Sequence, residues 1–486
     1  MSDSKNMNIM QTKNYLYFAL AALLLITSCK KSFLDQVPPN GVPVATSIET
    51  DNDLADAVNG MYVDMKVYEF FGRDCPVLGD LLADNTYVSS TNSGRYLSES
   101  NYSFISTTAE ASDMWDYGYT SILQANRIIS SGVPADSNSN ELIGEAYIAR
   151  GLMYLELVNY YATPYTVNPS APGVPLVTIS TANTGAFIKP ARSTVAQIYA
   201  QIISDLDSAY LIMPVSSTTL HAINSDYLCK WAAKAIEARA YLYEGDYANA
   251  RDAALIVVQN GGYTLATTAS AFASYWASPD AVANKLETIF ELNMNASSNN
   301  GFNGLDAIYD PGAYGDILAT DSLYDDYTST DMRQALMIPA VRGGYPVHQV
   351  NKYQNIANTD RDEVKIIRYA EVVLTLAEGY AQTGDDADAQ KYVNLLAQLR
   401  DPAFGGYTST GAQLVSDIID ERRKESAFEG LRWFDLMRIN AVVNRPQDAG
   451  SYPSYPTVSL TDIRRLFPIP QNEITANPNM VQNPGY

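Results

Sequence analysis

Side chains that could perform acid–base or nucleophilic chemistry are few and dispersed in this 486-residue chain. It has only two histidines, His221 and His348, and neither lies near a His, Cys or Asp cluster with metal-ligand spacing. The sequence lacks an H-E-x-x-H zinc motif, a G-x-S-x-G nucleophile turn and a glycine-rich phosphate loop. Paired carboxylates could hydrolyse glycosides, but no pair among the 54 acidic residues is distinguished by its position. We therefore predict a protein that is not an enzyme and needs no cofactor.

Four aspartates could in principle bind a calcium ion. They lie within eleven residues of one another, but their spacing departs from the EF-hand pattern and lacks its central glycine. We favour a solvated acidic loop and predict no metal site. The four residues are Asp321, Asp325, Asp326 and Asp331.

Cys29 is suited to a different reaction, the attachment of a lipid. The apolar run Tyr15–Ile26 is shorter than the roughly 20 residues that span a bilayer, and small residues separate it from the thiol. This arrangement resembles the signal peptide of a bacterial lipoprotein, and an ordinary secretory peptide with an incidental cysteine is the alternative. We predict that residues 1–28 are removed, that Cys29 carries the lipid, and that 29–45 form a tether. The lipid is the only membrane anchor that we expect.

The net charge limits which partners we expect, and the number of cysteines indicates whether we expect disulfides. The formal net charge of −22 repels phosphates, so nucleic acid is excluded as a predicted partner. Besides Cys29 the chain holds Cys75 and Cys229, which could form a disulfide in an oxidising compartment. Two cysteines so far apart do not make a disulfide framework, and we favour free, buried thiols.

The elements that must position any functional residue are mostly helices. Apolar residues recur at helical spacing over Leu54–Met65 and Trp115–Ile129. The segments 145–155, 234–247 and 369–385 each place small residues on one face of a helical pattern, and in the last two a Gly-Asp step separates consecutive helices. This resembles tetratricopeptide repeats, although unrelated alanine-rich helical hairpins would look similar.

We therefore predict a mainly α fold in which tetratricopeptide-like helix pairs form the scaffold. Loop-rich insertions at 162–192 and 262–350 interrupt these pairs, with a few short strands, of which Glu287–Asn293 is the best candidate. Insertions on a rigid scaffold are where binding residues tend to lie. We divide the mature chain into an N-terminal region, 46–215, and a C-terminal region, 216–486, interlocked into one compact body.

The run Leu414–Arg438 combines apolar residues at helical spacing with a second stripe of charges. Along one helix, Glu429 would pair with Arg432, and Asp435 with Arg438. A partly buried network of this kind would fix orientation, so we interpret these charges as structural rather than catalytic. The charged residues of this motif are Glu421, Arg422, Glu425, Glu429, Arg432 and Asp435.

Several segments together resemble the SusD/RagB family, the surface lipoproteins of nutrient-uptake systems in Bacteroidetes-type bacteria. The similar strings are ERRKE and FEGLRWFDLMR within 421–438, FPIP and NPGY within 467–486, and Cys29 followed by Phe33-Leu34-Asp35. The resemblance extends over nearly the whole chain. It implies a SusD-like superhelix of paired α-helices.

The resemblance also implies a function without covalent chemistry. Such a protein captures nutrient oligomers, in our interpretation oligo- or polysaccharides, and delivers them to a TonB-dependent SusC-like transporter. We expect an outer-membrane location, lipid-anchored and facing the extracellular side. The first alternative is a RagB-type lipoprotein that captures oligopeptides, and the second is a helical-repeat scaffold with no role in transport.

Aromatic residues in the insertions, and in a polar loop near residue 96, are the predicted ligand contacts. Their rings offer apolar planes for the flat faces of sugars, while amides and carboxylates can satisfy the hydroxyls. We expect a glycan site built from Trp276 together with Tyr96 or Tyr309. The full set of candidate ligand-binding residues is Tyr96, Tyr275, Trp276, Tyr309, Tyr314 and Tyr345.

Overall fold

The computed structural model describes residues 47–180, 188–216, 225–278 and 286–486. The predicted signal peptide, Cys29 and most of the predicted tether lie outside these residues. From Ile48 to Tyr486 the chain forms one compact unit. The boundary that we predict between residues 215 and 216 stays a prediction.

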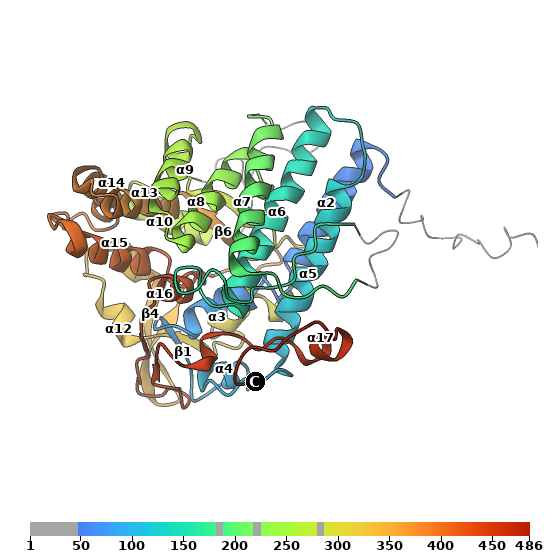
Figure 1. Cartoon of the computed structure of the whole chain (residues 1–486). Helices are drawn as coiled ribbons and strands as arrows, with labels where there is room; N and C mark the ends of the chain where they lie inside the picture. The colour runs from blue at the N-terminus through green and yellow to red at the C-terminus, as the bar shows by residue number, and fades with distance from the viewer. Residues whose placement is uncertain (1–46, 181–187, 217–224, 279–285) are drawn as a thin grey trace, which may run out of the picture. The chain divides into compact units, whose positions relative to one another are not determined.

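A row of long helices forms the scaffold of this unit. They are α2 (Asp51–Met65), α5 (Ala109–Ile129), α6 (Ser137–Tyr161), α7 (Val195–Ile212), α8 (Lys230–Glu244), α9 (Tyr247–Asn260), α13 (Tyr369–Gln382), α14 (Asp386–Arg400) and α15 (Gly411–Glu425). Helices α5 to α9 each pack against the next one in the chain, and α2 lies beside α5 (Figure 1). Helix α13 then packs on α9, α14 and α15. The predicted mainly α fold is confirmed.

The hairpin of α8 and α9 shows why these sequences form helix pairs. Gly245 ends α8 in the left-handed conformation, with φ 80°, which a glycine adopts without steric cost. The next residue, Asp246, caps α9 because its carboxylate accepts a hydrogen bond from the backbone N–H of Asn249 at 3.2 Å. Gly384 and Asp385 repeat the arrangement between α13 and α14.

Shorter elements lie between and beside these helices. The short helices are α3 (Asp74–Leu81), α4 (Leu97–Ser100), α10 (Ala269–Ala277), α11 (Leu305–Tyr309), α12 (Asp321–Asp325), α16 (Arg432–Arg438) and α17 (Gln471–Ala476), with 3₁₀ turns at Gly301–Asn303 (η4), Met332–Leu336 (η5) and Ile463–Arg465 (η6). The strands are β1 (Thr86–Val88), β2 (Thr288–Leu292), β3 (Ile317–Ala319), β4 (Met337–Arg342), β5 (Tyr345–Val350), β6 (Val364–Arg368), β7 (Val443–Asn444) and β8 (Thr457–Val458). The predicted strand in 287–293 is therefore present as β2.

The strands form small antiparallel sheets. The four-stranded sheet has the order β1-β3-β5-β4, so it joins residues near 87 to the insertion around 340. Strand β2 pairs with β6, and β7 pairs with β8. The first sheet brings two loop regions that are distant in sequence to one side of the helical scaffold.

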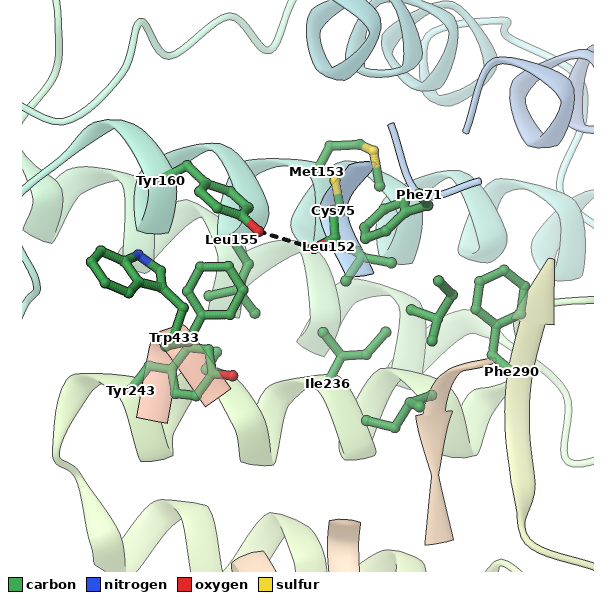
Figure 2. Close-up of a cluster of buried hydrophobic side chains, with 14 of the residues drawn as sticks. Phe71, Cys75, Leu152, Met153, Leu155, Tyr160, Ile236, Tyr243, Phe290 and Trp433 are labelled. Carbon is green, nitrogen blue, oxygen red and sulfur yellow. Dashed lines mark hydrogen bonds between the residues drawn. The ribbon is translucent and has the colours of Figure 1, made fainter. Parts of the chain in front are cut away.

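The hydrophobic core extends from the scaffold helices to these shorter elements. Figure 2 shows Cys75 of α3 beside α6, with Ile236 of α8 and Phe290 of β2 contributing to the same cluster. The Tyr160 hydroxyl donates a hydrogen bond to the Cys75 carbonyl at 3.0 Å, which attaches α6 to α3. Cys75 and Cys229 are both free, as predicted, although Cys229 is only half-buried.

The run Leu414–Arg438 is not one continuous helix. Helix α15 ends at Glu425 and α16 begins at Arg432, with a turn between them. Phe428 and Gly430 both have positive φ in this turn, 68° and 80°. Gly430 also lies against the backbone of α3, where a Cβ would approach the Pro76 Cα to 2.6 Å. The single helix that the spacing predicted is therefore interrupted where the chain comes into close contact with α3.

Candidate functional site

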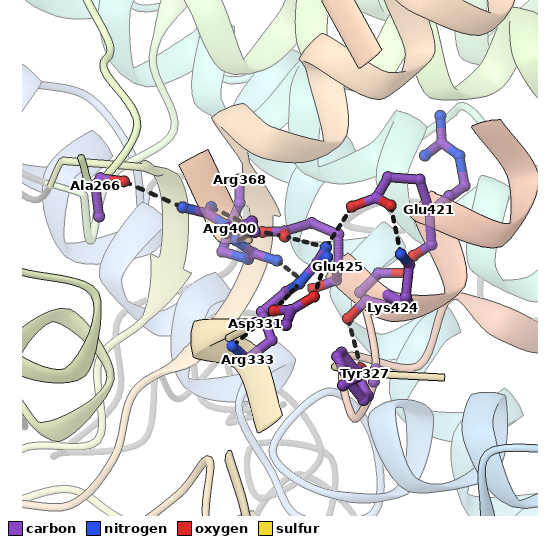
Figure 3. A network of polar contacts seen from close by, with 12 residues as sticks. Ala266, Tyr327, Asp331, Arg333, Arg368, Arg400, Glu421, Lys424 and Glu425 are labelled. Carbon is purple, nitrogen blue, oxygen red and sulfur yellow. Dashed lines mark hydrogen bonds and ion pairs between the residues drawn. The ribbon is translucent and has the colours of Figure 1, made fainter. Parts of the chain in front are cut away.

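The charges of the C-terminal motif lie inside the protein and form a dense network (Figure 3). Glu425 accepts hydrogen bonds from Arg400 at 2.9 and 3.0 Å, from Arg368 at 3.0 Å and from Arg333 at 3.2 Å. Burial alone would raise the pKa of the Glu425 carboxyl, but the guanidinium groups of Arg400 and Arg368 outweigh burial and hold that pKa far below its usual range. Each charge is engaged by protein partners, as a structural role requires.

The pairs within this network differ from those that helical spacing predicted. Asp435 and Arg438 do pair, at 2.9 Å. Glu429 instead binds Lys352 and Arg368, each at 2.6 Å, and Arg432 binds Asp84 at 2.7 Å. The predicted Glu429–Arg432 pair is wrong because the turn before α16 separates the two side chains.

The remaining two members of the motif are engaged in the same way. Glu421 accepts a hydrogen bond from Arg333 at 2.7 Å and pairs with Lys424 at 2.7 Å. Arg422 donates to the Thr375 hydroxyl at 2.8 Å, and its Nε lies 3.7 Å from Glu378. All six predicted residues therefore contact protein groups in the interior.

Three of the four aspartates considered as calcium ligands make contacts with protein groups. Asp331 is buried and receives two hydrogen bonds from the Arg333 guanidinium, at 2.7 and 2.9 Å. Asp326 pairs with Arg423 at 2.8 Å, and Asp321 contacts the His348 ring at 3.0 Å. The expectation of a wholly solvated acidic loop is wrong for Asp331.

Four of the predicted ligand-binding aromatic residues are buried rather than exposed. Trp276 is 1% exposed and lies beneath the cations of Lys352, Lys365 and Arg368, whose charged groups are 4.2–5.1 Å from its rings. Tyr275, at 6% exposed, donates or accepts a hydrogen bond with Thr288 at 2.7 Å. Neither ring offers a free face to a sugar.

Tyr309 and Tyr96 are buried for similar reasons. Tyr309 stacks on Tyr353, with ring centroids 5.8 Å apart, and Tyr96 donates its hydroxyl hydrogen bond to Asp74. The expected site built from Trp276 with Tyr96 or Tyr309 is therefore closed to a sugar in this structure, because the segments that carry these residues pack onto the core instead of projecting from it.

The other two predicted residues, Tyr314 and Tyr345, lie on one solvent-accessible surface. Three segments form it, and we call it the loop surface: Thr91–Arg95, Tyr314–Asp316 and Arg342–Tyr345. Tyr345 is 45% exposed, and Tyr314 is half-buried. The Arg95 guanidinium lies over the Tyr314 ring, 3.7 Å from its centroid. This contact joins the loop near residue 95 to the insertion near residue 314.

Polar contacts hold the three segments of the loop surface together. Asp316, which is buried, accepts hydrogen bonds from the backbone N–H and the hydroxyl of Ser93. Arg342 donates to the Thr91 carbonyl at 2.9 Å and to the Tyr314 carbonyl at 2.7 Å. Arg342 is not among the residues predicted from the sequence, because its two partners come close to it only when the sheet pairs distant segments.

The β4–β5 hairpin presents Tyr345 at this surface. Its two-residue turn, Gly343-Gly344, has φ of 60° and 88°, the conformation that favours glycine in tight hairpins. A Cβ at Gly343 would overlap the Thr91 hydroxyl, so the hairpin tip lies directly against the neighbouring loop. The loop surface thus offers an exposed ring, a second ring capped by a cation, and hydrogen-bonding groups fixed in place.

The helix pairs and the loop surface define a class of protein: a helical-repeat scaffold that carries irregular polar and aromatic loops on one side. Comparison with known proteins shows which family of this class the chain resembles. The model of the SusD family matches residues 340–486, and a second model, described as starch-binding associating with outer membrane, matches residues 32–242. The two matches together cover most of the chain.

Relatives and solved structures agree with these matches. SusD-like protein P2 of Formosa agariphila is 26% identical, over 98% of this chain and 100% of that protein. A putative sugar binding protein from Bacteroides vulgatus has a similar structure, with a TM-score of 0.81 and 29% identity over 91% of this chain and 100% of the other. A SusD superfamily protein from Bacteroides thetaiotaomicron gives a TM-score of 0.79 and 27% identity, covering 90% of this chain and 100% of that one.

The chain therefore belongs to the SusD family, as its motifs predicted. Within the described residues, every helix is too short or too polar to cross a bilayer.

Proposed function

We propose that this protein is a lipid-anchored receptor that binds nutrient oligosaccharides at the outer surface of the outer membrane and delivers them to a TonB-dependent SusC-like transporter. The observation that carries this proposal is that SusD family models match both the N-terminal and the C-terminal part of the chain. The name of the structurally similar sugar binding protein from Bacteroides vulgatus supports a carbohydrate ligand. The name of the second family model supports association with the outer membrane.

The loop surface is the proposed place of ligand contact. The Tyr345 side chain is exposed at this surface. The half-buried Tyr314 belongs to the same surface, with the Arg95 guanidinium over its ring. Sugars combine flat C–H faces with rims of hydroxyls, which such rings and fixed polar groups can satisfy. Binding on this surface needs no covalent step, so we propose a receptor and not an enzyme.

The binding proposal is tested by affinity electrophoresis through a panel of neutral polysaccharides, followed by calorimetry with the matching oligosaccharide. We expect retardation of the wild-type protein by at least one polysaccharide and a loss of about tenfold in affinity, about 1.4 kcal/mol, for Tyr345→Ala. Tyr392→Ala on α14 serves as the matched control and should bind normally. Unchanged affinity in Tyr345→Ala would remove the loop surface from the binding site.

Anchoring and delivery require a separate test in cells. Cys29→Ser should shift the protein from the membrane fraction to the soluble fraction, since the acyl chain is the proposed anchor. A tagged wild-type chain should copurify with a large β-barrel protein after mild detergent extraction. Membrane retention of Cys29→Ser would contradict the lipid anchor, and purification without any barrel would contradict the proposed delivery.

A further inference from the structure

A cavity of about 850 Å³ lies between α10 and the segment that runs from α12 to the start of β4. We call it the α10 cavity. Its size falls within the range of about 300–1,000 Å³ that small-molecule sites occupy. Residues 267–269 and 272–274 line one side together with Ala277, and Met332 and residues 334–337 line the other. Asn351, the residue directly after β5, lines the cavity, and Tyr345 of the loop surface begins the same strand, so the two are about 20 Å apart at 3.4 Å per residue.

The base of the α10 cavity is apolar and firmly supported. Phe272 and Leu336 belong to a small buried cluster that is separate from the main core and also contains Trp276. Behind this base, the Arg400 guanidinium lies 4.6 Å from the centroid of the Phe272 ring, which connects the cluster to the buried ion network. A base of this kind is preformed, because its side chains are fixed by packing before any ligand arrives.

The rim of the cavity is polar. Within the described residues, the side chains of Gln354, Ser329 and Tyr324 line the cavity and have no hydrogen-bond partner in the protein. The Tyr324 ring is held in place by stacking on His348, with centroids 3.8 Å apart and planes inclined by 13°. An amide and two hydroxyls that make no hydrogen bond within the protein, placed around an apolar base, suit a ligand that carries many hydroxyl groups.

The charges at the cavity argue for a neutral ligand. Among the described lining residues, Asp331 is the one ionisable carboxylate, and it is paired with Arg333 at 2.7 Å. Lysine and arginine are absent from that described lining, so nothing there attracts an anion. A peptide would be expected to add a strand to the sheet edge at β4, but Pro339 in that strand has no N–H to donate.

From this combination we infer that the α10 cavity is a second binding site for a neutral oligosaccharide, distinct from the loop surface. The inference rests on the proposed function, since it assumes that the protein handles glycans. Two sites on one chain would let a long polymer be held at two points, which raises the overall avidity without any new contact at either site.

The test fills the cavity without removing any of its side chains. Ala273 is an exposed residue of α10 that lines the cavity, and Ser270 is an exposed residue of the same helix that does not. Ala273→Trp should therefore block the site, and Ser270→Trp is the matched control. Calorimetry with maltohexaose, cellohexaose, laminarihexaose and xylohexaose gives the number of bound molecules per chain. A second readout is the rate at which peroxide oxidises Met332, which lines the cavity and is half-buried.

We expect two bound molecules per wild-type chain for at least one hexasaccharide, two for Ser270→Trp and one for Ala273→Trp. The same sugar should slow Met332 oxidation at least threefold in the wild type and not in Ala273→Trp. Loss of all binding in Ala273→Trp alone would also support the cavity and would contradict the loop surface. One bound molecule in every variant, with unchanged Met332 oxidation, would overturn the second site and leave the proposed function standing. No binding of any hexasaccharide to the wild type would contradict both.

Discussion

Arg400, the last residue of α14, donates hydrogen bonds at 2.7 and 2.8 Å to both carboxylate oxygens of Glu287, and both side chains are fully buried. Glu287 directly precedes β2, and the same guanidinium reaches Glu425 at the end of α15. Arg368, at the end of β6, contacts both acids at 3.0 Å. Four elements from distant parts of the chain therefore meet at one charged cluster.

Removing Arg400 should be strongly destabilising. Arg400→Met keeps much of the side-chain volume but leaves Glu287 and Glu425 in the interior with one cation fewer. We expect the free energy of unfolding to fall by about 3–5 kcal/mol, measured by urea denaturation. Lys391→Met, at an exposed position of the same helix, is the control and should change the stability by less than about 0.5 kcal/mol. A loss below about 1 kcal/mol for Arg400→Met would show that the cluster does not need this cation.

The helix pairs were predictable because their signals are local. Small residues on one face, a glycine at the end of one helix and an aspartate at the start of the next lie within a single hairpin, as at Gly245 and Asp246. The ion network was predictable only in part. Glu425 and its neighbours are visible in the sequence, but Glu287 lies 113 residues from Arg400 and nothing in the local pattern links them.

The candidate site was predicted less well than the fold. Loop composition indicated exposed aromatic rings, yet Trp276 is covered by cations from β6 and from the segment before it. Burial of a loop residue depends on where the loop folds back, and composition does not determine that. Tyr314 and Tyr345 are accessible because they lie at the tip of the hairpin and beside it, positions that the glycine pair at 343–344 helps to define.

Two glycines within helices should respond oppositely to alanine. Gly379 of α13 faces α9, where a Cβ would lie 2.7 Å from the Arg251 Cβ and 3.0 Å from the Tyr247 carbonyl oxygen. We expect Gly379→Ala to cost about 1–3 kcal/mol of unfolding free energy, because α13 must move away from α9. Gly60 of α2 has no atom within 4 Å of a Cβ position, so Gly60→Ala should stabilise the protein by about 0.5–1 kcal/mol. Thermal or urea unfolding of both variants distinguishes these results, and equal effects would contradict the close packing of α13 on α9.

The stability should also depend on pH through Asp80. Burial raises the pKa of its carboxyl to about 7, although hydrogen bonds from Asn85 at 2.6 Å and from the Gly430 N–H at 2.9 Å oppose the shift. Between about pH 4 and pH 7 the folded protein holds a proton that the unfolded chain releases. The free energy of unfolding should therefore fall as the pH rises through this window, by up to about 1.4 kcal/mol per pH unit from this group.

Asp80→Asn removes this titration and should flatten the pH dependence between pH 5 and pH 7 in urea denaturation. Asp252→Asn, at an exposed position of α9, is the control and should leave the slope as in the wild type. Because the substitution also alters two hydrogen bonds, the slope is compared and not the absolute stability. Parallel curves for Asp80→Asn and the wild type would contradict a titrating Asp80.

Arg342 should stabilise the loop surface locally and leave the fold unaffected. Its guanidinium reaches the Thr91 and Tyr314 carbonyls from β4, and its side chain is partly exposed. We expect Arg342→Ala to speed amide hydrogen exchange at residues 91–95 and 313–316, because these loops lose the group that joins them.

Oligosaccharide affinity should fall about three- to tenfold, since a loosened surface must be ordered on binding. The global stability should change by less than about 1 kcal/mol. Arg251→Ala is the control for loss of a partly exposed cation, since Arg251 binds Asp252 and Thr383 far from the loop surface. Faster exchange with unchanged affinity would separate the ordering of these loops from ligand binding, and unchanged exchange would show that Arg342 does not hold them.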